Sequence, residues 1–443
     1  MSNQNVNLSL DVQGFINEKP FSGFQKMVFF LCFMIVLLDG FDTAAIGYIA
    51  PSLLKEWGLT KAALAPVLSA ALFGLAAGAL LSGPIADRIG RKMMLIASVT
   101  IFGIGCLCSA FSPDLMTLTI LRFITGIGLG AAMPNAVTMI SEFSPDQRRS
   151  VITNAMFTGF PLGAACGGFL AAWIIPQFGW RTVLLVGGIT PLVLLIGLIF
   201  FMPESIRFMV SRQANATKIL SVLRKISSDV IDAGSFYMTE VKKNVNNKSS
   251  LGVVLSKQYR LGSLMLWISY FMGLVIFYAL INWMPILFKD AGLAPRNATL
   301  ISALFPLGGV GAIVFGLLMD RFNANKVIAI GYLLTALSVC AIGQMAGNVF
   351  GLVLVVFLAG AIMNTSQSSL PALAAAYYPT MGRATGVSWM LGIGRFGGIA
   401  GSYLVALLAS QAFTFSEIFA IVAIPGLIAS AALFIKRAAD YRD

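Results

Sequence analysis

The amino-acid sequence predicts an all-α membrane protein whose twelve transmembrane helices form two six-helix pseudo-repeats. Hydrophobic residues make up 58% and charged residues only 11% of the 443 residues, too few charges to cover a soluble protein of this size. Apolar runs of about 20 residues, the length that crosses a bilayer as a helix, recur along the chain. Two loop sequences from the first half also return in the second half at nearly constant spacing.

The apolar runs divide the chain into two bundles and three polar segments. The spans are predicted at 26–50, 62–84, 93–111, 115–140, 150–175, 181–202, 261–287, 297–319, 326–346, 349–375, 383–408 and 414–436. The resulting domains are an N-terminal segment (1–25), a first bundle (26–202), a linker (203–260), a second bundle (261–436) and a tail (437–443). The linker is rich in Lys, Ser and Asn, and its spacing suggests short amphipathic helices.

The net charge of +12 could suggest a nucleic-acid partner, but the placement of the cations indicates a membrane topology instead. Only five of the 30 Lys and Arg residues fall in loops on the side opposite the termini, namely Lys55, Lys61, Arg181, Lys289 and Arg296. This bias predicts that both termini lie in the cytoplasm, and we expect no nucleic-acid binding.

Several other features limit the possible chemistry. The first 25 residues lack an apolar core followed by a cleavage site, so we expect no cleaved signal peptide. All five cysteines fall within predicted spans, where they are expected to be small buried apolar side chains. The chain has no histidine, which excludes a histidine proton relay and a histidine-ligated metal, and it has no ATP-binding P-loop motif. We expect no metal, no cofactor and no enzymatic activity. A proton gradient is the expected energy source.

Two loops show that the second half repeats the first. Gly83-Pro84-Ile85-Ala86-Asp87-Arg88 shares its glycine and its Asp-Arg pair with Gly316-Leu317-Leu318-Met319-Asp320-Arg321, 233 positions later. Pro145-Asp146-Gln147-Arg148-Arg149 is echoed by Pro379-Thr380-Met381-Gly382-Arg383, 234 positions later. Such repeats are typical of secondary transporters, in which the substrate site lies between the halves near the bilayer midplane.

Asp39 and Asp42 are the only acids deep inside any predicted span. A charge at the bilayer centre costs several kcal/mol, so intramembrane acids are rare and usually face a cavity or a partner. Their spacing of three residues places both on one face of a helix. The pair predicts a proton or ion site, and the alternative is a helix-packing pair satisfied by neighbouring hydroxyls or amides.

Two arginines also lie inside predicted spans. The helical rise places Asp39 and Asp42 roughly 20 and 24 Å from the start of their span. Arg122 lies roughly 10 Å from the end of the fourth span, on the side opposite the termini, so its depth in the membrane is close to that of Asp42. Arg395 falls roughly 18 Å into the eleventh span, near its middle. These charges are not repeated in the other half of the chain. Met272 lies 233 positions after Asp39, and Val355 lies 233 positions after Arg122. Pro161 lies 234 positions before Arg395. Unrepeated buried charge indicates a site, although Arg122 could also be a structural tie between helices.

Three stretches of the sequence resemble a known family. Residues 83–92 and residues 203–207, after the sixth span, resemble signature sequences of the major facilitator superfamily. Asp39-Gly40-Phe41-Asp42 resembles the first helix of the aromatic acid:proton symporters within that superfamily. The resemblance covers essentially the whole chain. It implies a major facilitator fold that imports a small aromatic carboxylate, such as 4-hydroxybenzoate or protocatechuate, together with a proton.

The resemblance also implies that the first, fourth, seventh, tenth and eleventh helices line a cavity. Candidate substrate contacts on these helices are Tyr270, Asn282, Trp283, Asn364, Ser366, Gln367, Ser388 and Trp389. Aromatic faces would stack on a benzene ring, and amides or hydroxyls could bond its hydroxyl groups. Each of these side chains could instead serve in packing. Four other aromatic residues, Tyr332, Tyr377, Tyr378 and Trp57, are expected at the membrane interfaces.

These observations lead to one expected mechanism and three alternatives. Asp39 and Asp42 should exchange the proton, Arg122 should tune them, and Arg395 should bind the substrate carboxylate. Gating is expected from charged residues of the loops, which are Asp87, Arg88, Arg91, Glu142, Arg149, Asp320, Arg321 and Arg383. We expect a monomer in a bacterial inner membrane. The alternatives are import of benzoate, vanillate or muconate, proton-driven export of drugs by the same fold, and a membrane-bound chemoreceptor.

Overall fold

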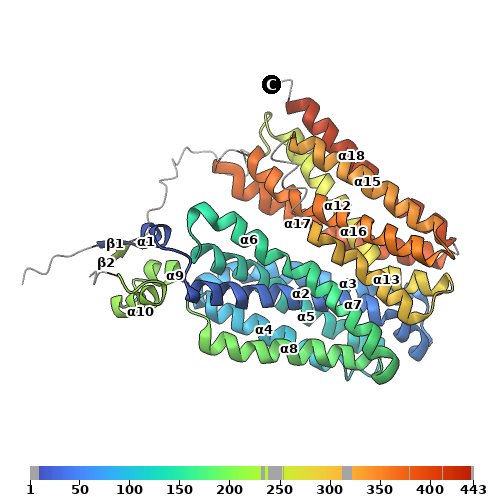
Figure 1. Ribbon diagram of the computed structural model, residues 1–443, viewed down its shortest axis with the longest axis horizontal. Coiled ribbons are helices and arrows are strands. Elements are labelled where there is room, and N and C mark those ends of the chain that lie inside the picture. The colour runs from blue at the N-terminus through green and yellow to red at the C-terminus, as the bar shows by residue number, and fades with distance from the viewer. Residues whose placement is uncertain are drawn as a thin grey trace, which may run out of the picture.

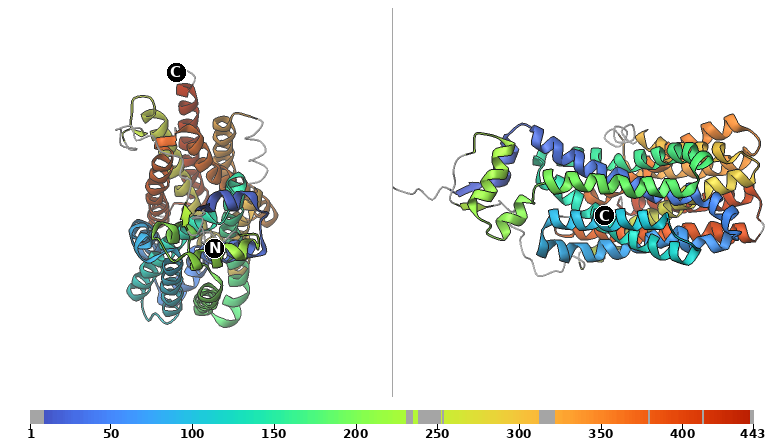
Figure 2. Two further views of the ribbon diagram at one scale, coloured as in Figure 1. Left: turned by 90° about the vertical axis from the view of Figure 1, so that its left-hand side faces the viewer. Right: turned by 90° about the horizontal axis from the view of Figure 1, so that it is seen from below.

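The protein consists of two bundles of long helices (Figure 1). The computed structural model describes residues 9–230, 235–237, 252, 254–311, 322–378, 380–411 and 413–440. Viewed from one end, the helices of the first half group below those of the second half (Figure 2). Within the described residues, 11 helices are long and apolar enough to cross a membrane.

The first bundle holds the six spans predicted for the first half. In chain order it contains α2 (Gly23–Trp57), α3 (Lys61–Ile89), α4 (Arg91–Ser109), α5 (Leu115–Glu142), α6 (Arg149–Phe157), α7 (Gly159–Phe178) and α8 (Trp180–Phe201). The fifth predicted span is divided into α6 and α7 at Thr158. Helix α2 begins with a capping box, in which Ser22 and Gln25 bond each other's backbone N–H groups, and ends at Gly58, whose φ is 61°.

The second bundle has the same organisation. It contains α12 (Arg260–Asp290), α13 (Pro295–Leu307), η2 (Gly308–Gly311), α15 (Ala324–Gln344), α16 (Val349–Tyr377), α17 (Thr380–Ser410) and α18 (Phe415–Asp440). The eighth predicted span, 297–319, corresponds to α13 and η2 as far as Gly311. The remainder of that span lies outside the described residues.

Short elements from the N-terminus and the linker gather at one end of the first bundle (Figure 1). They are β1 (Ser9–Asp11), α1 (Val12–Glu18), α9 (Ile206–Ser211), α10 (Ala216–Ile226) and β2 (Ser235–Tyr237). The two strands pair in parallel, with Ser9 opposite Ser235. We call this the linker end of the molecule and the opposite end the far end.

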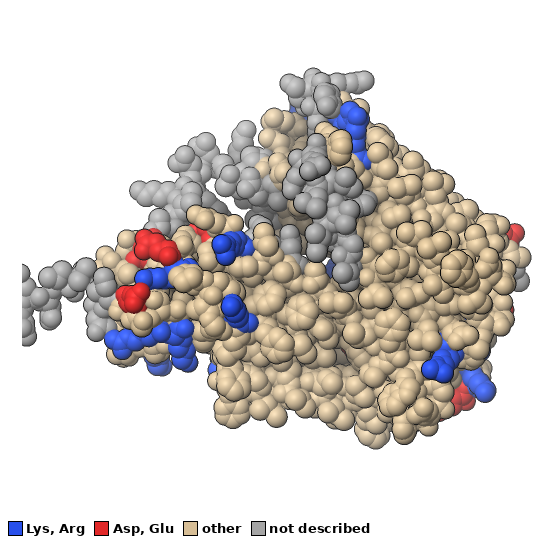
Figure 3. All heavy atoms as spheres, in the orientation of Figure 1, with Lys and Arg blue, Asp and Glu red and all other residues tan. Residues whose placement is uncertain are grey.

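The surface has the charge distribution of a membrane protein. In the view of Figure 3, charged side chains gather toward the linker end and at the far end, and the broad surface between them is almost free of charge. Large apolar side chains at mid-helix positions are exposed, among them Val193, Leu337 and Leu354. An apolar surface of this extent fits a hydrocarbon environment, because soluble proteins rarely expose large contiguous apolar patches.

The two bundles pack against each other toward the far end. Gly47 of α2 lies against Ile281 and Asn282 of α12. An ion pair of 2.5 Å between Lys61, at the start of α3, and Asp290, at the end of α12, joins the halves at this end. Toward the linker end the helix axes of the two bundles diverge (Figure 1). The contact between the halves is therefore concentrated on one side.

Candidate functional site

The acid pair lies in the buried part of α2. Every residue from 38 to 51 is buried, and Asp39 and Asp42 are 3% and 1% exposed. Gly40 lies between the two acids, and a Cβ at this position would overlap the carbonyl oxygen of Phe160 on α7. The glycine of the Asp-Gly-Phe-Asp sequence therefore permits the close contact of α2 and α7 that encloses the acids.

Asp42 forms a closed ion pair with Arg122 of α5. Arg122 Nη1 lies 3.1 Å from each carboxylate oxygen of Asp42, and the side chains are 0% and 1% exposed. Nη2 of the same guanidinium donates to the Thr125 hydroxyl at 3.3 Å. The thiol of Cys106 on α4 also adjoins the pair. This arrangement agrees with the depth estimated from the sequence, which placed Arg122 near Asp42.

Asp39 has a different environment. Its Oδ1 accepts a hydrogen bond of 3.3 Å from the Thr43 hydroxyl, one turn along α2. Arg395 of α17 is the cation that acts on Asp39 most strongly. Among the described residues, no cation approaches the Asp39 carboxylate within the 4 Å of an ion pair. The two acids therefore face two different arginines, one on each bundle.

Arg395 lies where α17 crosses α12. Its neighbours are Tyr270 and Tyr278 of α12, together with Asp39 from the other bundle. Gly394 and Gly398 make this crossing possible, because a Cβ on Gly394 would overlap the Tyr270 ring and one on Gly398 would lie 2.5 Å from the Tyr278 ring. The structure thus brings the predicted Tyr270 and Arg395 together and adds Tyr278.

Aromatic rings continue from Tyr278 across the boundary between the bundles. The Phe277 ring centroid lies 5.2 Å from that of Tyr278, 6.0 Å from that of Phe305 and 6.1 Å from that of Phe160 on α7. None of these four rings was singled out from the sequence. The available signal was that Tyr278 follows Tyr270 by eight residues, which returns it to nearly the same face of a helix.

Two of the predicted substrate contacts make hydrogen bonds within the protein. Asn282 Nδ2 donates to the Ser402 hydroxyl at 2.9 Å, and Trp283 Nε1 donates to the Ser402 carbonyl at 3.0 Å. Both side chains are buried, at 1% and 0% exposure. They tie α12 to α17 near the far end. Asn282 Oδ1 nevertheless has no hydrogen-bond partner among the described residues.

The predicted polar residues of α16 also make internal bonds. Asn364 Nδ2 donates to the carbonyls of Phe305 and Gly360 at 3.1 and 2.8 Å, and Ser366 bonds within its helix. Gln367 Nε2 donates to the Tyr270 carbonyl at 3.3 Å, and its Oε1 accepts from Tyr332 at 2.5 Å. Tyr332 is fully buried, so its predicted place at a membrane interface is wrong.

Tyr378 is likewise buried, at 1% exposure, and its hydroxyl donates to the Ser263 hydroxyl at 2.8 Å, so the interfacial prediction is wrong for this residue too.

The two predicted substrate contacts of α17 that lie nearer the linker end are more accessible. Trp389 is 43% exposed and stacks on Trp267 of α12 with ring centroids 5.8 Å apart, while Ser388 is exposed. The place of these two residues in the substrate path stays a prediction.

Polar residues of the first bundle meet at the linker end. Glu204 Oε1 accepts from the backbone N–H groups of Arg91 and Lys92 at 2.8 and 3.2 Å and so caps the start of α4. Glu142, at the end of α5, accepts a hydrogen bond from the Ser205 hydroxyl. The segment after the sixth span therefore connects two loops that are far apart in the sequence.

The structure describes only some of the other predicted gating residues. Arg149 pairs with Asp146 at 2.5 Å and donates from Nε to the Ser141 carbonyl at 2.9 Å, and Arg88 is exposed. Asp87 belongs to α3 and Arg383 to α17, but their side chains lie outside the described part of the structure. Asp320 and Arg321 lie outside the described residues altogether.

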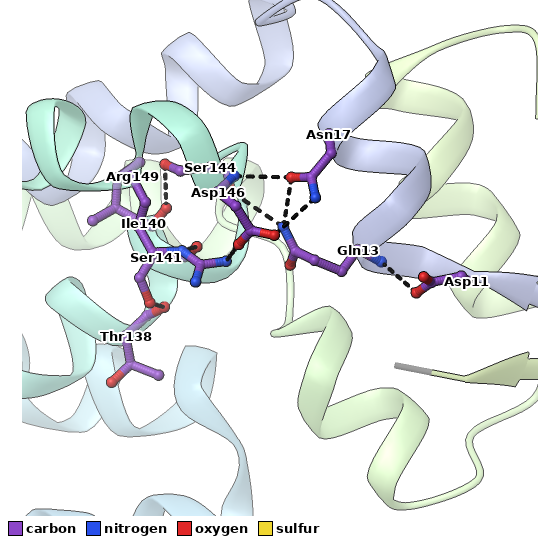
Figure 4. A network of polar contacts seen from close by, with 9 residues as sticks. All are labelled: Asp11, Gln13, Asn17, Thr138, Ile140, Ser141, Ser144, Asp146 and Arg149. Carbon is purple, nitrogen blue, oxygen red and sulfur yellow. Dashed lines mark hydrogen bonds and ion pairs between the residues drawn. The ribbon is translucent and has the colours of Figure 1, made fainter. Parts of the chain in front are cut away.

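The N-terminal segment binds the loop that carries Asp146 (Figure 4). Asn17 accepts from the Asp146 backbone N–H and donates to the Asp146 carboxylate, both at 2.8 Å. Lys19 donates to Asp229 of the linker at 3.0 Å, and this hydrogen bond lowers the pKa of the Asp229 carboxyl. The sequence did not predict this docking.

The chain that forms these two bundles matches a protein-family model. The model of the major facilitator superfamily matches residues 32–315 and 266–442. The chain belongs to the major facilitator superfamily. The 4-hydroxybenzoate transporter PcaK of Pseudomonas aeruginosa is 48% identical over 436 residues, which cover 98% of this chain and 97% of that protein. A gallate transporter of Pseudomonas putida is 45% identical over 97% of this chain and 95% of its own length.

The major facilitator fold is also found by comparison with solved structures. A crystal structure of a D-xylose–proton symporter matches with a TM-score of 0.72, at 18% identity, over 92% of this chain and 97% of that one. The predicted fold class and family are therefore confirmed. As a member of the major facilitator superfamily the chain is a membrane transporter and not an enzyme. The described residues contain no group of three acidic, cysteine or histidine side chains placed to bind a metal.

Proposed function

We propose that the protein imports a hydroxylated aromatic carboxylate, such as 4-hydroxybenzoate or protocatechuate, together with a proton. One observation carries the proposal: Arg395 adjoins two tyrosines of α12 and interacts electrostatically with Asp39 of the other bundle. An arginine can bind both oxygens of a carboxylate, and tyrosine rings offer stacking and hydrogen bonding to a phenol. The 4-hydroxybenzoate and gallate transporters named above, which cover nearly all of the chain, support this substrate class.

Proton coupling follows from the charge of the substrate. An aromatic carboxylate is an anion at neutral pH, and a negative cell interior opposes its entry by about 2.3 kcal/mol per charge per 100 mV. A proton that enters with the anion removes this opposition. The acid pair Asp39 and Asp42, with Arg122 beside it, supplies titratable groups at the level of Arg395 for that purpose.

The positive-inside bias supports a bacterial inner-membrane protein with the linker end, and both termini, in the cytoplasm. In this orientation the bundles 26–202 and 261–436 move as two units and the linker 203–260 connects them. The segments 1–25 and 437–443 remain on the cytoplasmic side. We expect the monomer to be the transporting unit, because each chain contains both halves of the site.

The packing at the far end supports a state closed to the outside. The exposed ion pair of Lys61 and Asp290 contributes little to this closure, since exposed pairs are worth about 0–1 kcal/mol. Close packing of α2 against α12, at Gly47 and Ile281, excludes water more effectively. Alternation requires these contacts to separate while the linker end closes.

The test is uptake by purified protein in proteoliposomes with an imposed inward proton gradient. We expect accumulation of radiolabelled 4-hydroxybenzoate that stops when a protonophore is added. Unlabelled 4-hydroxybenzoate, protocatechuate, gallate, benzoate and vanillate should compete in an order that defines the substrate. Failure of every aromatic acid to compete, combined with gradient-driven efflux of cationic dyes, would favour the drug-exporter alternative.

A further inference from the structure

The two acids of α2 differ in how firmly the protein holds their charge. The carboxylate of Asp42 is bonded at 3.1 Å through both oxygens to Arg122, in a pair from which solvent is excluded. Opening this ion pair would leave a guanidinium buried without a counter-charge. Removing one partner of a buried pair is strongly unfavourable, so we expect the pair to stay closed during transport.

Asp39 is buried as well, but within the described part of the chain its carboxylate is held only by the Thr43 hydroxyl at 3.3 Å and by the charge of Arg395. The cation that balances Asp39 therefore belongs to the other bundle and is the one that we assign to the substrate. When a substrate carboxylate binds Arg395, that cation is shared between two carboxylates. Like charges so close together favour protonation of one of them.

The other titratable groups around Asp39 come from its own helix and from four others. Asp42 lies on the same helix, Arg395 comes from α17, and Tyr278 of α12 adjoins both Arg395 and Asp39. Arg122 of α5 and Cys106 of α4 lie on the side of Asp42. Helix α8, which also packs on α2, carries Arg181, and this side chain pairs with Glu56 near the far end.

We infer that Asp39 alone exchanges the transported proton, and that substrate binding at Arg395 drives the exchange, while Asp42 stays paired with Arg122. This inference rests on the proposed function and deepens it. One proton from solution adds to the Asp39 carboxylate as one carboxylate anion binds Arg395. The occupied site then has the same net charge as the empty one. Release of the substrate returns Arg395 to Asp39, and the proton leaves.

The test measures proton uptake on binding, with a pH indicator in weakly buffered detergent solution, for 4-hydroxybenzoate and purified protein. Wild-type protein should take up about one proton per bound anion, and its affinity should fall about tenfold per pH unit at pH values where free Asp39 is ionised. Asp39→Asn should bind the anion without proton uptake or this pH dependence. In vesicles it should still exchange internal for external substrate but not accumulate it.

Two controls separate Asp39 from other acids. Glu56→Gln changes an acid of the same helix far from the site and should keep the proton uptake. The double variant Asp42→Asn with Arg122→Gln removes the other acid without leaving a buried charge and should also keep it. If this double variant does not fold, Asp39→Asn still decides, because it leaves the pair of Asp42 and Arg122 intact.

The outcomes distinguish the inference from the proposed function. Proton uptake that persists in Asp39→Asn, or that is lost in a folded double variant able to bind substrate, overturns the inference alone. Wild-type protein that binds no aromatic acid overturns the proposed function and the inference with it. Wild-type binding without any proton uptake overturns both the coupling and the role of Asp39.

Discussion

Nη1 of Arg122 lies 3.1 Å from both carboxylate oxygens of Asp42, and neither side chain is more than 1% exposed. Two charges from helices α2 and α5 thus neutralise each other inside the first bundle. Asp39, three residues earlier, is left to interact with Arg395 of the second bundle. One acid therefore stabilises a bundle, and the other lies where the bundles meet.

The first prediction concerns the stability of that pair. Arg122→Gln or Asp42→Asn alone should lower the stability of the protein by about 3–5 kcal/mol, because each leaves a buried charge without a partner. The double variant should recover most of the loss. Thermal melting of the purified protein in detergent measures all three. A double variant as unstable as the sum of the single variants would show that the pair is not the source of the effect.

The second prediction concerns the glycines that let Arg395 approach α12. Gly398→Ala should place a Cβ 2.5 Å from the Tyr278 ring, and Gly394→Ala should displace Tyr270, so both should weaken 4-hydroxybenzoate binding at least tenfold. Isothermal titration or fluorescence quenching can measure this affinity.

Gly392→Ala is the matched control for these two variants. It lies on the same helix, and a Cβ there would meet no atom within 4 Å. Alanine is the better helix former by about 0.5–1 kcal/mol, so this variant should bind normally and be no less stable. Equal losses in all three variants would mean that α17 tolerates no change in this region and that the two tyrosines have no special part.

Much of the fold was accessible from the sequence because the bilayer requires long apolar helices. The spans and the unusual position of the buried charges follow from that requirement, the repeat was visible in two recurring loop sequences, and the depth estimate already placed Arg122 level with Asp42. The rotation of each helix about its axis was not accessible, because spans that are apolar on every face carry little periodic signal. For this reason the hydrogen bonds of Asn282 and Trp283 to Ser402 were not predicted from the sequence.

The docking of the N-terminal segment was missed for a different reason. Its three buried residues, Val12, Phe15 and Ile16, follow the spacing of an apolar helix face, but one short turn of helix is a weak signal beside the membrane spans. Its partners, Asp146 and Asp229, are 129 and 210 residues away in the chain. Pairings at such separations do not leave a pattern in a single sequence.

The third prediction tests this docking. Ile16 is 1% exposed, so Ile16→Ala should remove about 2–4 kcal/mol of local packing and release the segment. The glutamyl endopeptidase Glu-C should then cleave after Glu18 faster than in the wild type. Asn17→Ala removes exposed hydrogen bonds only and should have a smaller effect. Unchanged cleavage of Ile16→Ala would show that the segment is held by other contacts.

The fourth prediction concerns the cap that joins α4 to the segment after the sixth span. Glu204→Ala removes the acceptor of the Arg91 and Lys92 backbone N–H groups, and it should slow the maximal transport rate several-fold without changing substrate affinity. The reason is that loops at this end must rearrange between states, whereas the substrate site lies elsewhere.

Asp114→Ala provides the comparison for Glu204→Ala. Asp114 caps the start of α5 with a bond of 2.8 Å to the Thr117 N–H, so both variants lose one cap, worth about 1 kcal/mol. Only Glu204 lies in the loop cluster of the linker end. Initial rates in vesicles and equilibrium binding distinguish rate from affinity, and equal slowing by both variants would assign the effect to general loss of stability.

The central claim is that Arg395 binds the carboxylate of the substrate. Losing one partner of a desolvated charge pair typically costs about 2–5 kcal/mol, and lysine cannot reproduce the two parallel bonds of a guanidinium. The most direct measurement is a binding titration of wild-type, Arg395→Lys and Arg395→Ala proteins with 4-hydroxybenzoate and with its neutral amide. The wild type should strongly prefer the acid, Arg395→Lys should bind it weakly, and Arg395→Ala should lose most of the preference. If Arg395→Ala still prefers the acid as strongly as the wild type does, Arg395 is not the partner of the carboxylate.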